Sequence, residues 1–224
     1  MVRKALGVLL LAGTCAAPAS AAVIYTQDFE NTNTLPDGWS GAGGISPTEG
    51  LNPFGFGRQH LFNNTSDTTT LHVATGAAHT TATVSFDLAF WDSVDQGGDT
   101  FRVLLNGVAI IDTSNFGNYF GEFSGPGVLL TDPHGAVSFA VPNYGKNPGY
   151  RDQGRRFTTT VAHTAQALTL TFQYPNSQGG TDEAFGIDNV KVEINSRTTP
   201  PVPEPTSLAL LGLAGVFVAR RRRA

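Results

Sequence analysis

The sequence predicts an all-β fold, a two-sheet antiparallel sandwich of jelly-roll type, from three observations. Charged residues make up only 14% of the chain, against roughly 25% in an average soluble domain, which disfavours long surface helices. Turn formers are abundant, with 26 Gly and 13 Pro. Apolar and polar residues alternate in several segments, and such half-buried strands bury their apolar faces by packing sheet on sheet. A closed barrel is the alternative arrangement.

About nine strands are predicted, separated by Gly, Asn, Asp and Pro. In residues 83–90 every second side chain from Val84 to Phe90 is apolar, and residues 167–174 repeat this pattern. The dipeptide Asn106-Gly107 tolerates positive φ and therefore predicts a two-residue hairpin turn. The predicted strands cover residues 23–29, 71–75, 83–90, 101–105, 108–111, 136–141, 156–162, 167–174 and 187–194.

The last predicted strand indicates a β-bulge. Ile187 and Val190 are both apolar, although a regular strand would point them to opposite faces. One extra residue at Asp188-Asn189 lets both side chains point into the core. Such a bulge also changes the direction in which Asp188 points.

The two ends of the chain are predicted to be export signals around one domain. Residues 1–21 read as a signal peptide, with a basic start, an apolar helix and small residues where signal peptidase cuts. Residues 22–195 form the sandwich, and residues 196–201 form a Pro- and Thr-containing linker. The only cysteine, Cys15, lies in the predicted signal peptide, so disulfides and zinc–thiolate sites are excluded from the mature chain.

Residues 202–224 contain a short proline motif, an apolar stretch and a basic cluster. The apolar stretch, residues 208–219, is shorter than the roughly 20 residues of an ordinary membrane-spanning helix. One interpretation is a short membrane anchor, and the other is a transient sorting signal. The residues that carry the signal are Val202, Pro203, Glu204, Pro205, Arg220, Arg221, Arg222 and Arg223.

This C-terminal combination resembles the PEP-CTERM sorting signal of Gram-negative bacteria. The resemblance implies that an exosortase recognises and processes the chain during export, and that the short helix associates transiently with the membrane. It also implies a final location in the cell envelope, on the outer surface or in the extracellular matrix.

The body carries a second resemblance. Asp28-Phe29-Glu30, residues 35–39 and the run Gly186-Ile187-Asp188-Asn189-Val190 are similar to extracellular jelly-roll domains of the choice-of-anchor kind. This resemblance implies a sandwich fold and an extracellular setting.

Acidic residues predict a structural Ca²⁺ site. Ca²⁺ takes roughly six to eight oxygen ligands, and carboxylates on two loops supply them well. If the first and last strands pair, Asp28 or Glu30 adds further ligands. The alternative is that these are turn residues. The candidate ligands are Asp92, Asp95 and Asp99 in one loop and Asp182, Glu183 and Asp188 near the last strand.

Two aromatic loops, residues 116–121 and 143–151, combine rings with amide groups. This mixture stacks on sugars and forms hydrogen bonds with them, although rings at such positions also close the ends of a sandwich. The candidate glycan-binding residues are Tyr119, Phe120, Tyr144 and Tyr150.

Charge and sequence motifs narrow the range of functions that the chain could have. Residues 22–205 contain eight basic and 18 acidic groups, a formal charge of −10, which disfavours nucleic acid as a partner. The five His show no zinc-binding spacing, and no nucleophile turn is present. The sequence therefore favours a non-catalytic module that binds exopolysaccharide. A purely structural surface or biofilm protein is one alternative, and a carbohydrate-active enzyme with two carboxylates is the other.

Overall fold

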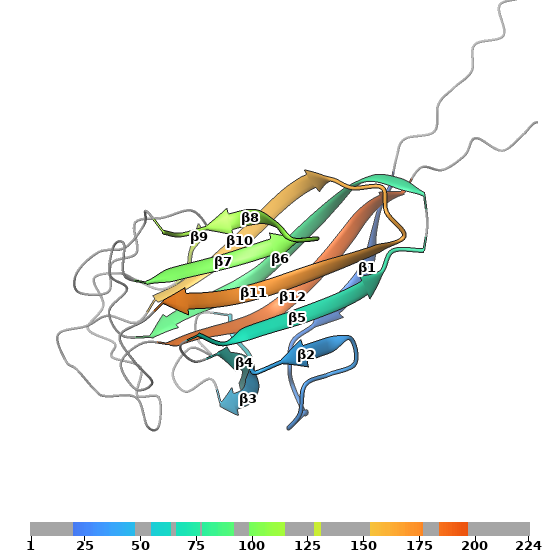
Figure 1. Cartoon of the computed structure of the whole chain (residues 1–224). Coiled ribbons are helices and arrows are strands. Elements are labelled where there is room, and N and C mark those ends of the chain that lie inside the picture. Colours follow the sequence, from blue (N-terminus) through green and yellow to red (C-terminus); the bar gives the residue numbers. More distant parts are fainter. Residues whose placement is uncertain are drawn as a thin grey trace, which may run out of the picture. The chain divides into compact units, whose positions relative to one another are not determined.

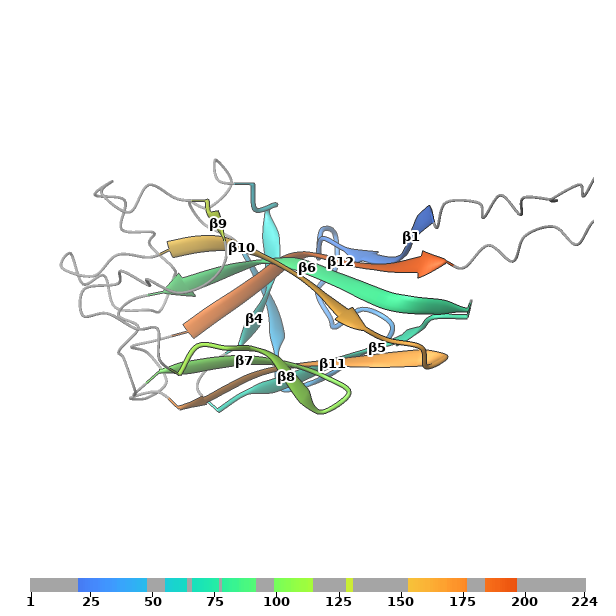
Figure 2. The same cartoon turned by 90° about the horizontal axis from the view of Figure 1, so that it is seen from above.

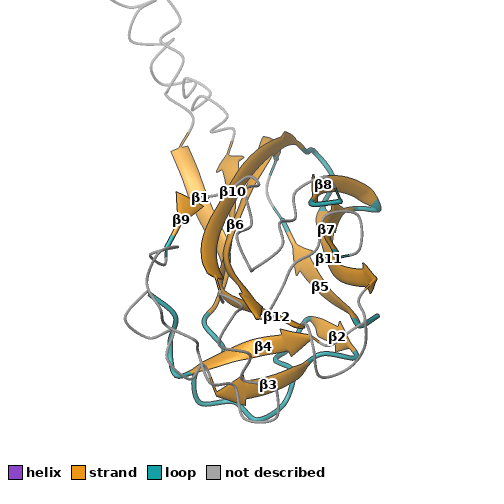
Figure 3. Cartoon of the chain, turned by 90° about the vertical axis from the view of Figure 1, so that its left-hand side faces the viewer, coloured by secondary structure: helices purple, strands orange, loops and turns teal. Residues whose placement is uncertain are grey.

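A computed structural model of the chain describes residues 20–47, 55–63, 66–76, 78–91, 99–114, 128–130, 153–176 and 184–196. These residues form strands and loops and contain no helix, as Figures 1 and 3 show. Accordingly, this part of the chain holds no helix long and apolar enough to cross a membrane. Residues 1–19 of the predicted signal peptide, the C-terminal apolar helix and the strand predicted at 136–141 lie outside the described residues, whereas Ser20 and Ala21 belong to a strand.

Seven strands form the first sheet: β1 (Ser20–Gln27), β3 (Gly44–Pro47), β4 (Gln59–Asn63), β6 (His79–Trp91), β9 (Val128–Leu129), β10 (Gln153–Ala162) and β12 (Ala184–Ser196). Their order is β3-β4-β12-β6-β10-β9, and β1 pairs with β12. The first and last strands therefore pair, which is the condition under which Asp28 or Glu30 could add ligands.

Five strands form the second sheet: β2 (Trp39–Gly41), β5 (Thr68–Ala74), β7 (Thr100–Leu105), β8 (Val108–Asp112) and β11 (Ala167–Asn176), in the order β2-β5-β11-β7-β8. Figure 2 shows β10, β6, β12 and β1 in one layer and β7, β8, β11 and β5 in the other. The described strands thus confirm the predicted antiparallel sandwich, and the closed-barrel alternative is wrong.

Aromatic rings from both sheets fill the space between the layers. Phe86 of β6 stacks on Phe157 at a centroid distance of 5.4 Å and meets Phe172 of β11 edge-on, also at 5.4 Å. Phe101 of β7 reaches across to Phe185 of β12 at 4.8 Å. Edge-to-face contacts of this kind add to the energy of burying the rings themselves. The core therefore joins the two sheets through phenylalanine pairs.

The hairpin between β7 and β8 has the predicted turn. Asn106 and Gly107 have φ angles of 48° and 82°. Positive φ at both central residues matches the twist of the flanking strands, and Gly adopts it without steric cost. The local sequence alone therefore determines this turn.

The predicted bulge in β12 is also present. Between the pairs Asp188–Asp87 and Lys191–Ser85, β12 advances by three residues while β6 advances by two. Asn189 takes the left-handed conformation, with φ of 51°. Ile187 and Val190 are consequently both buried, at 0% and 1% exposure.

Four strands were not predicted from the sequence: β2, β3, β4 and β9. They are two to five residues long, and three of them contain Gly, Pro, Asn or His rather than an alternating apolar pattern. Their partners in the sheets, not their intrinsic preferences, make them strands. The eight other predicted strands are all present, most of them longer than expected.

The strand registers define two ends of the sandwich. At one end β6 stops and β10 and β12 begin, because Phe90 pairs with Gln153 and Trp91 with Ala184. In the facing sheet β11 ends where β7 begins, and Figure 1 shows all these strand ends on its left-hand side. At the opposite end β12 stops, since Ser196 pairs with His79. We call these the loop end and the terminal end.

Replacing Phe101 by Ala is expected to destabilise the fold by about 3–5 kcal/mol, because it removes a buried ring and leaves a cavity. Phe101 is 1% exposed and contacts rings of β6 and β12 in the facing sheet. Urea unfolding measures the loss. Val108→Ala, at a side chain that is 69% exposed, is the control and should change stability by less than about 0.5 kcal/mol. A loss below about 1 kcal/mol for Phe101→Ala would contradict this description of the core.

Candidate functional site

The bulge of β12 organises a buried group of polar side chains. Asp188 and Asp87 are direct partners across β12 and β6, and both are fully buried. Because successive side chains alternate, they lie on the sheet face opposite to the core residues Phe86 and Leu88. Residues 55–59, which lead into β4, contact this group through the bonds described next.

Arg156 of β10 neutralises Asp87. Its Nε and Nη2 atoms donate to the two carboxylate oxygens of Asp87, both at 2.7 Å. Asn189 adds a third donor, because its Nδ2 lies 2.9 Å from Asp87 Oδ2 and 2.8 Å from the carbonyl oxygen of Gly55. A fork of this kind is the strongest geometry for pairing a carboxylate. The charge of Asp87 is thus compensated within the protein.

Asp188 lacks a comparable cation. Its Oδ2 accepts the backbone N–H of Gly57 at 2.8 Å, and its Oδ1 accepts that of Asn189 at 2.7 Å. Burial raises the pKa of Asp188 to about 7, and the negative charges of Asp87 and Glu30 add to this effect, while the two N–H donors partly oppose it. The Asp188 carboxyl therefore takes up a proton more readily than an ordinary aspartate.

Glu30 holds the segment before β4 from the other side. It accepts hydrogen bonds from the backbone N–H groups of Arg58 and Gln59 and from Arg58 Nε at 3.1 Å. Burial pushes its pKa upward, but these donors and the charge of Arg58 outweigh it and hold the pKa below its usual value. Gly57 lies so close to Glu30 that a Cβ atom there would collide with the carboxylate. A larger residue at this position would have to displace the Glu30 carboxylate.

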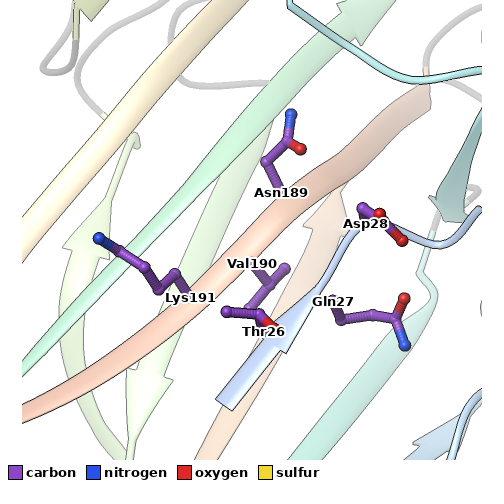
Figure 4. Close-up of a pocket in the computed structure, with 6 residues that line it drawn as sticks. All are labelled: Thr26, Gln27, Asp28, Asn189, Val190 and Lys191. Carbon is purple, nitrogen blue, oxygen red and sulfur yellow. The ribbon is translucent and has the colours of Figure 1, made fainter. Parts of the chain in front are cut away.

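An open pocket of about 270 Å³ lies between the end of β1 and the bulge. It is lined by Thr26, Gln27, Asp28, Asn189, Val190 and Lys191. Figure 4 shows the Lys191 and Asn189 side chains extending away from Asp28 and Gln27. Several of its polar groups have local partners, since Asp28 Oδ1 accepts the N–H of Glu30 and Lys191 Nζ pairs with Glu193. The pocket is thus a polar recess beside the bulge.

Four of the predicted calcium ligands fall on described residues: Asp28, Glu30, Asp99 and Asp188. Within the described ranges no three His, Cys, Asp or Glu side chains come together in a group able to hold a metal ion. Asp188 and Glu30 both bind the segment before β4, whereas Asp99 lies buried immediately before β7. Asp92, Asp95, Asp182 and Glu183 lie outside the described residues.

The predicted glycan-binding residues Tyr119, Phe120, Tyr144 and Tyr150 also lie outside the described residues, as do Val202, Pro203, Glu204, Pro205 and Arg220 to Arg223. Described strands bracket the aromatic segments. Before them β8 ends at Asp112, the register partner of Arg102, and after them β10 begins at Gln153, the partner of Phe90. Both strand termini lie at the loop end.

Sequence reasoning missed Asp87, Arg156 and Arg58. Asp87 lies on the outer face of its strand, which is an ordinary position for a polar residue and gave no signal of a site. Arg156 becomes its partner through the pairing of β10 with β6, 69 residues apart in sequence. The one local signal was the acidic residue next to the predicted bulge, Asp188.

Comparison with known proteins identifies the C-terminus. Residues 201–223 match the family model described as the PEP-CTERM protein-sorting motif. The chain carries a PEP-CTERM sorting motif. This motif indicates export and anchoring at the cell surface of Gram-negative bacteria, and it implies processing by an exosortase. No curated protein matches the chain.

The body of the chain has structural similarity to several solved domains. The CBM22-1 xylan-binding domain from Paenibacillus barcinonensis aligns with 11% identity and a TM-score of 0.39, covering 81% of this chain and 99% of that one. A family 35 carbohydrate-binding module from an environmental isolate aligns with 12% identity and a TM-score of 0.38, covering 75% and 91%. A cleaved adhesin domain of Lys-gingipain from Porphyromonas gingivalis aligns with 14% identity and a TM-score of 0.43, covering 75% and 96%.

Replacing Asn189 tests the bulge directly. Asn189→Ala and Asn189→Gly both remove the bonds to Asp87 and Gly55, but only Ala adds the steric cost of a left-handed conformation. Asn189→Ala should therefore be less stable than Asn189→Gly by about 1 kcal/mol in urea unfolding. Equal stability of the two variants would contradict the left-handed geometry at this position.

The raised pKa of Asp188 predicts a specific pH dependence. The folded state holds the Asp188 proton more tightly than the unfolded state, so this contribution to stability is complete below the unfolded pKa of 3.8 and is lost as pH rises through about 7. The stability of the wild type relative to Asp188→Asn should fall by up to about 1.4 kcal/mol per pH unit in that window. Urea unfolding of both proteins between about pH 5 and pH 8 measures the difference. A difference that does not change with pH would show that Asp188 is ionised throughout.

Proposed function

We propose that this chain is an exported surface or matrix protein whose body is a non-catalytic binding module for exopolysaccharide. The sorting motif supplies the extracellular setting. The observation that carries the proposal is the placement of the strand ends. The strands on either side of the aromatic segments end at the loop end, whereas β12, which precedes the sorting motif in sequence, ends at the terminal end.

This placement puts attachment and glycan binding at opposite ends of the sandwich. A chain attached through residues after Ser196 leaves from the terminal end. The segments that carry Tyr119, Phe120, Tyr144 and Tyr150 join strands at the loop end. Aromatic rings combined with amide groups suit a neutral hydroxylated polymer, because rings stack on sugar faces and amides bond to hydroxyls. The net negative body disfavours an acidic polymer that lacks a bridging cation.

Four of the described carboxylates, Asp87, Asp188, Asp112 and Glu30, have partners in the fold that disfavour a role in hydrolysis. A glycosidase needs two carboxyl groups that flank a cleft open to the sugar. Asp87 and Asp188 are adjacent, but both are fully buried and engaged by donors of the protein itself. Asp112 is paired with Arg102 at 2.9 Å, and Glu30 with Arg58 at 3.1 Å. These carboxylates therefore have structural partners in the fold.

Glycan binding is tested with the purified exported chain and the exopolysaccharide of its own bacterium. Tyr119→Ala with Tyr144→Ala should weaken binding by about tenfold or more, because each lost stacking contact costs roughly 1 kcal/mol. The matched control is Tyr119→Phe with Tyr144→Phe, which keeps both rings and should bind within a few-fold of the wild type. Isothermal titration gives both affinities.

Absence of saturable binding by the wild type would refute the proposal and favour a purely structural surface protein. Release of reducing ends from the polymer, abolished by one Asp or Glu substitution, would instead indicate the enzyme alternative. Equal weakening by the Ala and Phe pairs would show that the rings are not the contact.

We also propose that a structural Ca²⁺ stabilises the body near Asp188. Support comes from the uncompensated charge of this carboxyl, whose pKa burial raises to about 7, with Asp87 and Glu30 adding to the shift. A bound cation would offset that cost, and carboxylates are suitable ligands. Ca²⁺ that binds only the native state must raise the unfolding midpoint.

Thermal unfolding in millimolar Ca²⁺ and in chelator tests whether the folded body binds Ca²⁺. The midpoint should rise with Ca²⁺ in the wild type and in Asp112→Ala, whose carboxylate is half-exposed and paired with Arg102, but not in Asp188→Ala. No shift in the wild type would refute the calcium site. The same shift in Asp188→Ala would place the ion elsewhere.

A further inference from the structure

Two histidines and an asparagine form a hydrogen-bonded chain at the terminal end of the sandwich. His79 Nε2 lies 2.7 Å from His163 Nδ1, and the two rings stack with centroids 5.0 Å apart. His163 Nε2 lies 3.2 Å from Nδ2 of Asn106. Both imidazoles are buried, at 4% and 6% exposure. The three residues come from the start of β6, the turn between β10 and β11, and the β7–β8 hairpin.

The Thr169 bond fixes which end of the Asn106 amide faces His163. The backbone N–H of Thr169 donates to Asn106 Oδ1 at 2.8 Å, so the amide NH₂ of Asn106 must be the group that faces His163. His163 Nε2 therefore accepts and carries no hydrogen. A neutral His163 then carries its proton on Nδ1, which lies 2.7 Å from His79 Nε2 and can donate to it.

A proton added to either ring breaks this chain. A charged imidazole has N–H donors on both nitrogens. If His163 were charged, its Nε2–H would face the NH₂ of Asn106. If His79 were charged, its Nε2–H would face the N–H of His163. Each case places two donors face to face in a buried site, where the mismatch is costly.

We propose that His79, His163 and Asn106 form an acid-sensitive lock that ties the β7–β8 hairpin of one sheet to the start of β6 in the other. The lock is closed while both rings are neutral. When a ring gains a proton, the Asn106 bond opens and the hairpin turn loses its link to the turn between β10 and β11. His79 is also the register partner of Ser196, the last residue of β12. The opening thus occurs where the chain continues toward its sorting motif.

Burial favours the neutral form of His163. Burial lowers the pKa of His163, and the neighbouring imidazole of His79 lowers it further, while a backbone hydrogen bond involving Ala167 acts in the opposite direction. The strands around the His79–His163 pair carry other titratable or charged groups. These are His72 on β5, Asp87 on β6, Arg102 and Asp112 of the hairpin, Arg155 and Arg156 on β10, and Asp188, Lys191 and Glu193 on β12. His72 contacts Thr169, with its Nδ1 3.0 Å from Oγ1, and Asp87, Arg102 and Asp112 are occupied in ion pairs.

Global acid unfolding is not a suitable readout, because His60 is fully buried and burial lowers its pKa to about 3. Acid therefore destabilises the fold through His60 as well. Site-specific NMR of the exported chain avoids this. The imidazole spectra should show His163 with its proton on Nδ1 at neutral pH, and His163 should titrate below the usual value of about 6.5.

The lock also predicts where the structure opens. The amide of Asn106, bonded to the Thr169 carbonyl, and the amide of Thr169, bonded to Asn106 Oδ1, should exchange with solvent faster as His163 gains its proton. The amide of His72, bonded to the carbonyl of Gly38, should not follow this titration. An Nε2–H tautomer at His163, or ordinary titration without faster exchange, would overturn the proposal.

Asn106→Asp is the sharpest variant. One carboxylate oxygen still accepts the Thr169 N–H, and the other accepts from a charged His163, so acid should now close the lock. Proton affinity of His163 should rise at least tenfold, which is one pKa unit. Asn31→Asp is the control, because Asn31 is also left-handed, with φ of 60°, and contacts Arg58. An unchanged His163 titration in Asn106→Asp would refute the lock. If that variant does not fold, the tautomer of His163 in the wild type is the deciding measurement, and a proton on Nε2 would refute the lock.

Discussion

The sandwich depends on β12, the strand that pairs with β6, β4 and β1, and on the one extra residue it contains. Without the bulge, the side chains on the two sides of Asp188 would point to opposite faces, and one set of apolar residues would be exposed. With it, Phe185 and Ile187 before the bulge and Val190 and Val192 after it all reach the same core. The cost is a left-handed Asn189 and a buried acid beside it.

That cost explains the polar group on the outer face of the sheet. Asp87 and Asp188 meet as register partners, and two carboxylates at that spacing cannot both remain charged without compensation. Arg156 and Asn189 compensate Asp87, whereas Asp188 receives only backbone N–H groups. The segment before β4, held by Glu30 and Arg58, is ordered by the same set of bonds. One irregularity in a strand thus organises a loop, a buried acid pair and the recess beside β1.

Local rules predicted the features that depend on local geometry. The Asn106-Gly107 turn and the Asp188-Asn189 bulge followed from φ preference and side-chain parity, and the long alternating strands followed from their period. The missed features depend on distant partners. β2, β3 and β4 are too short for a pattern, Asp87 finds Arg156 only through sheet pairing, and His79 meets His163 across 84 residues. No spacing in the sequence encodes such contacts, because the fold creates them.

The bulge in β12 is the claim on which this account rests, and the strand register tests it most directly. Cross-strand proton contacts measured by NMR should join Ile187 with Leu88 before the bulge and Lys191 with Ser85 after it, as the pairing requires. Both contacts should appear in one spectrum, which only an extra residue in β12 permits. A continuous register, with Val190 opposite Ser85, would contradict it, and the burial of Val190, the Asp188 environment and the recess beside β1 would then need another explanation.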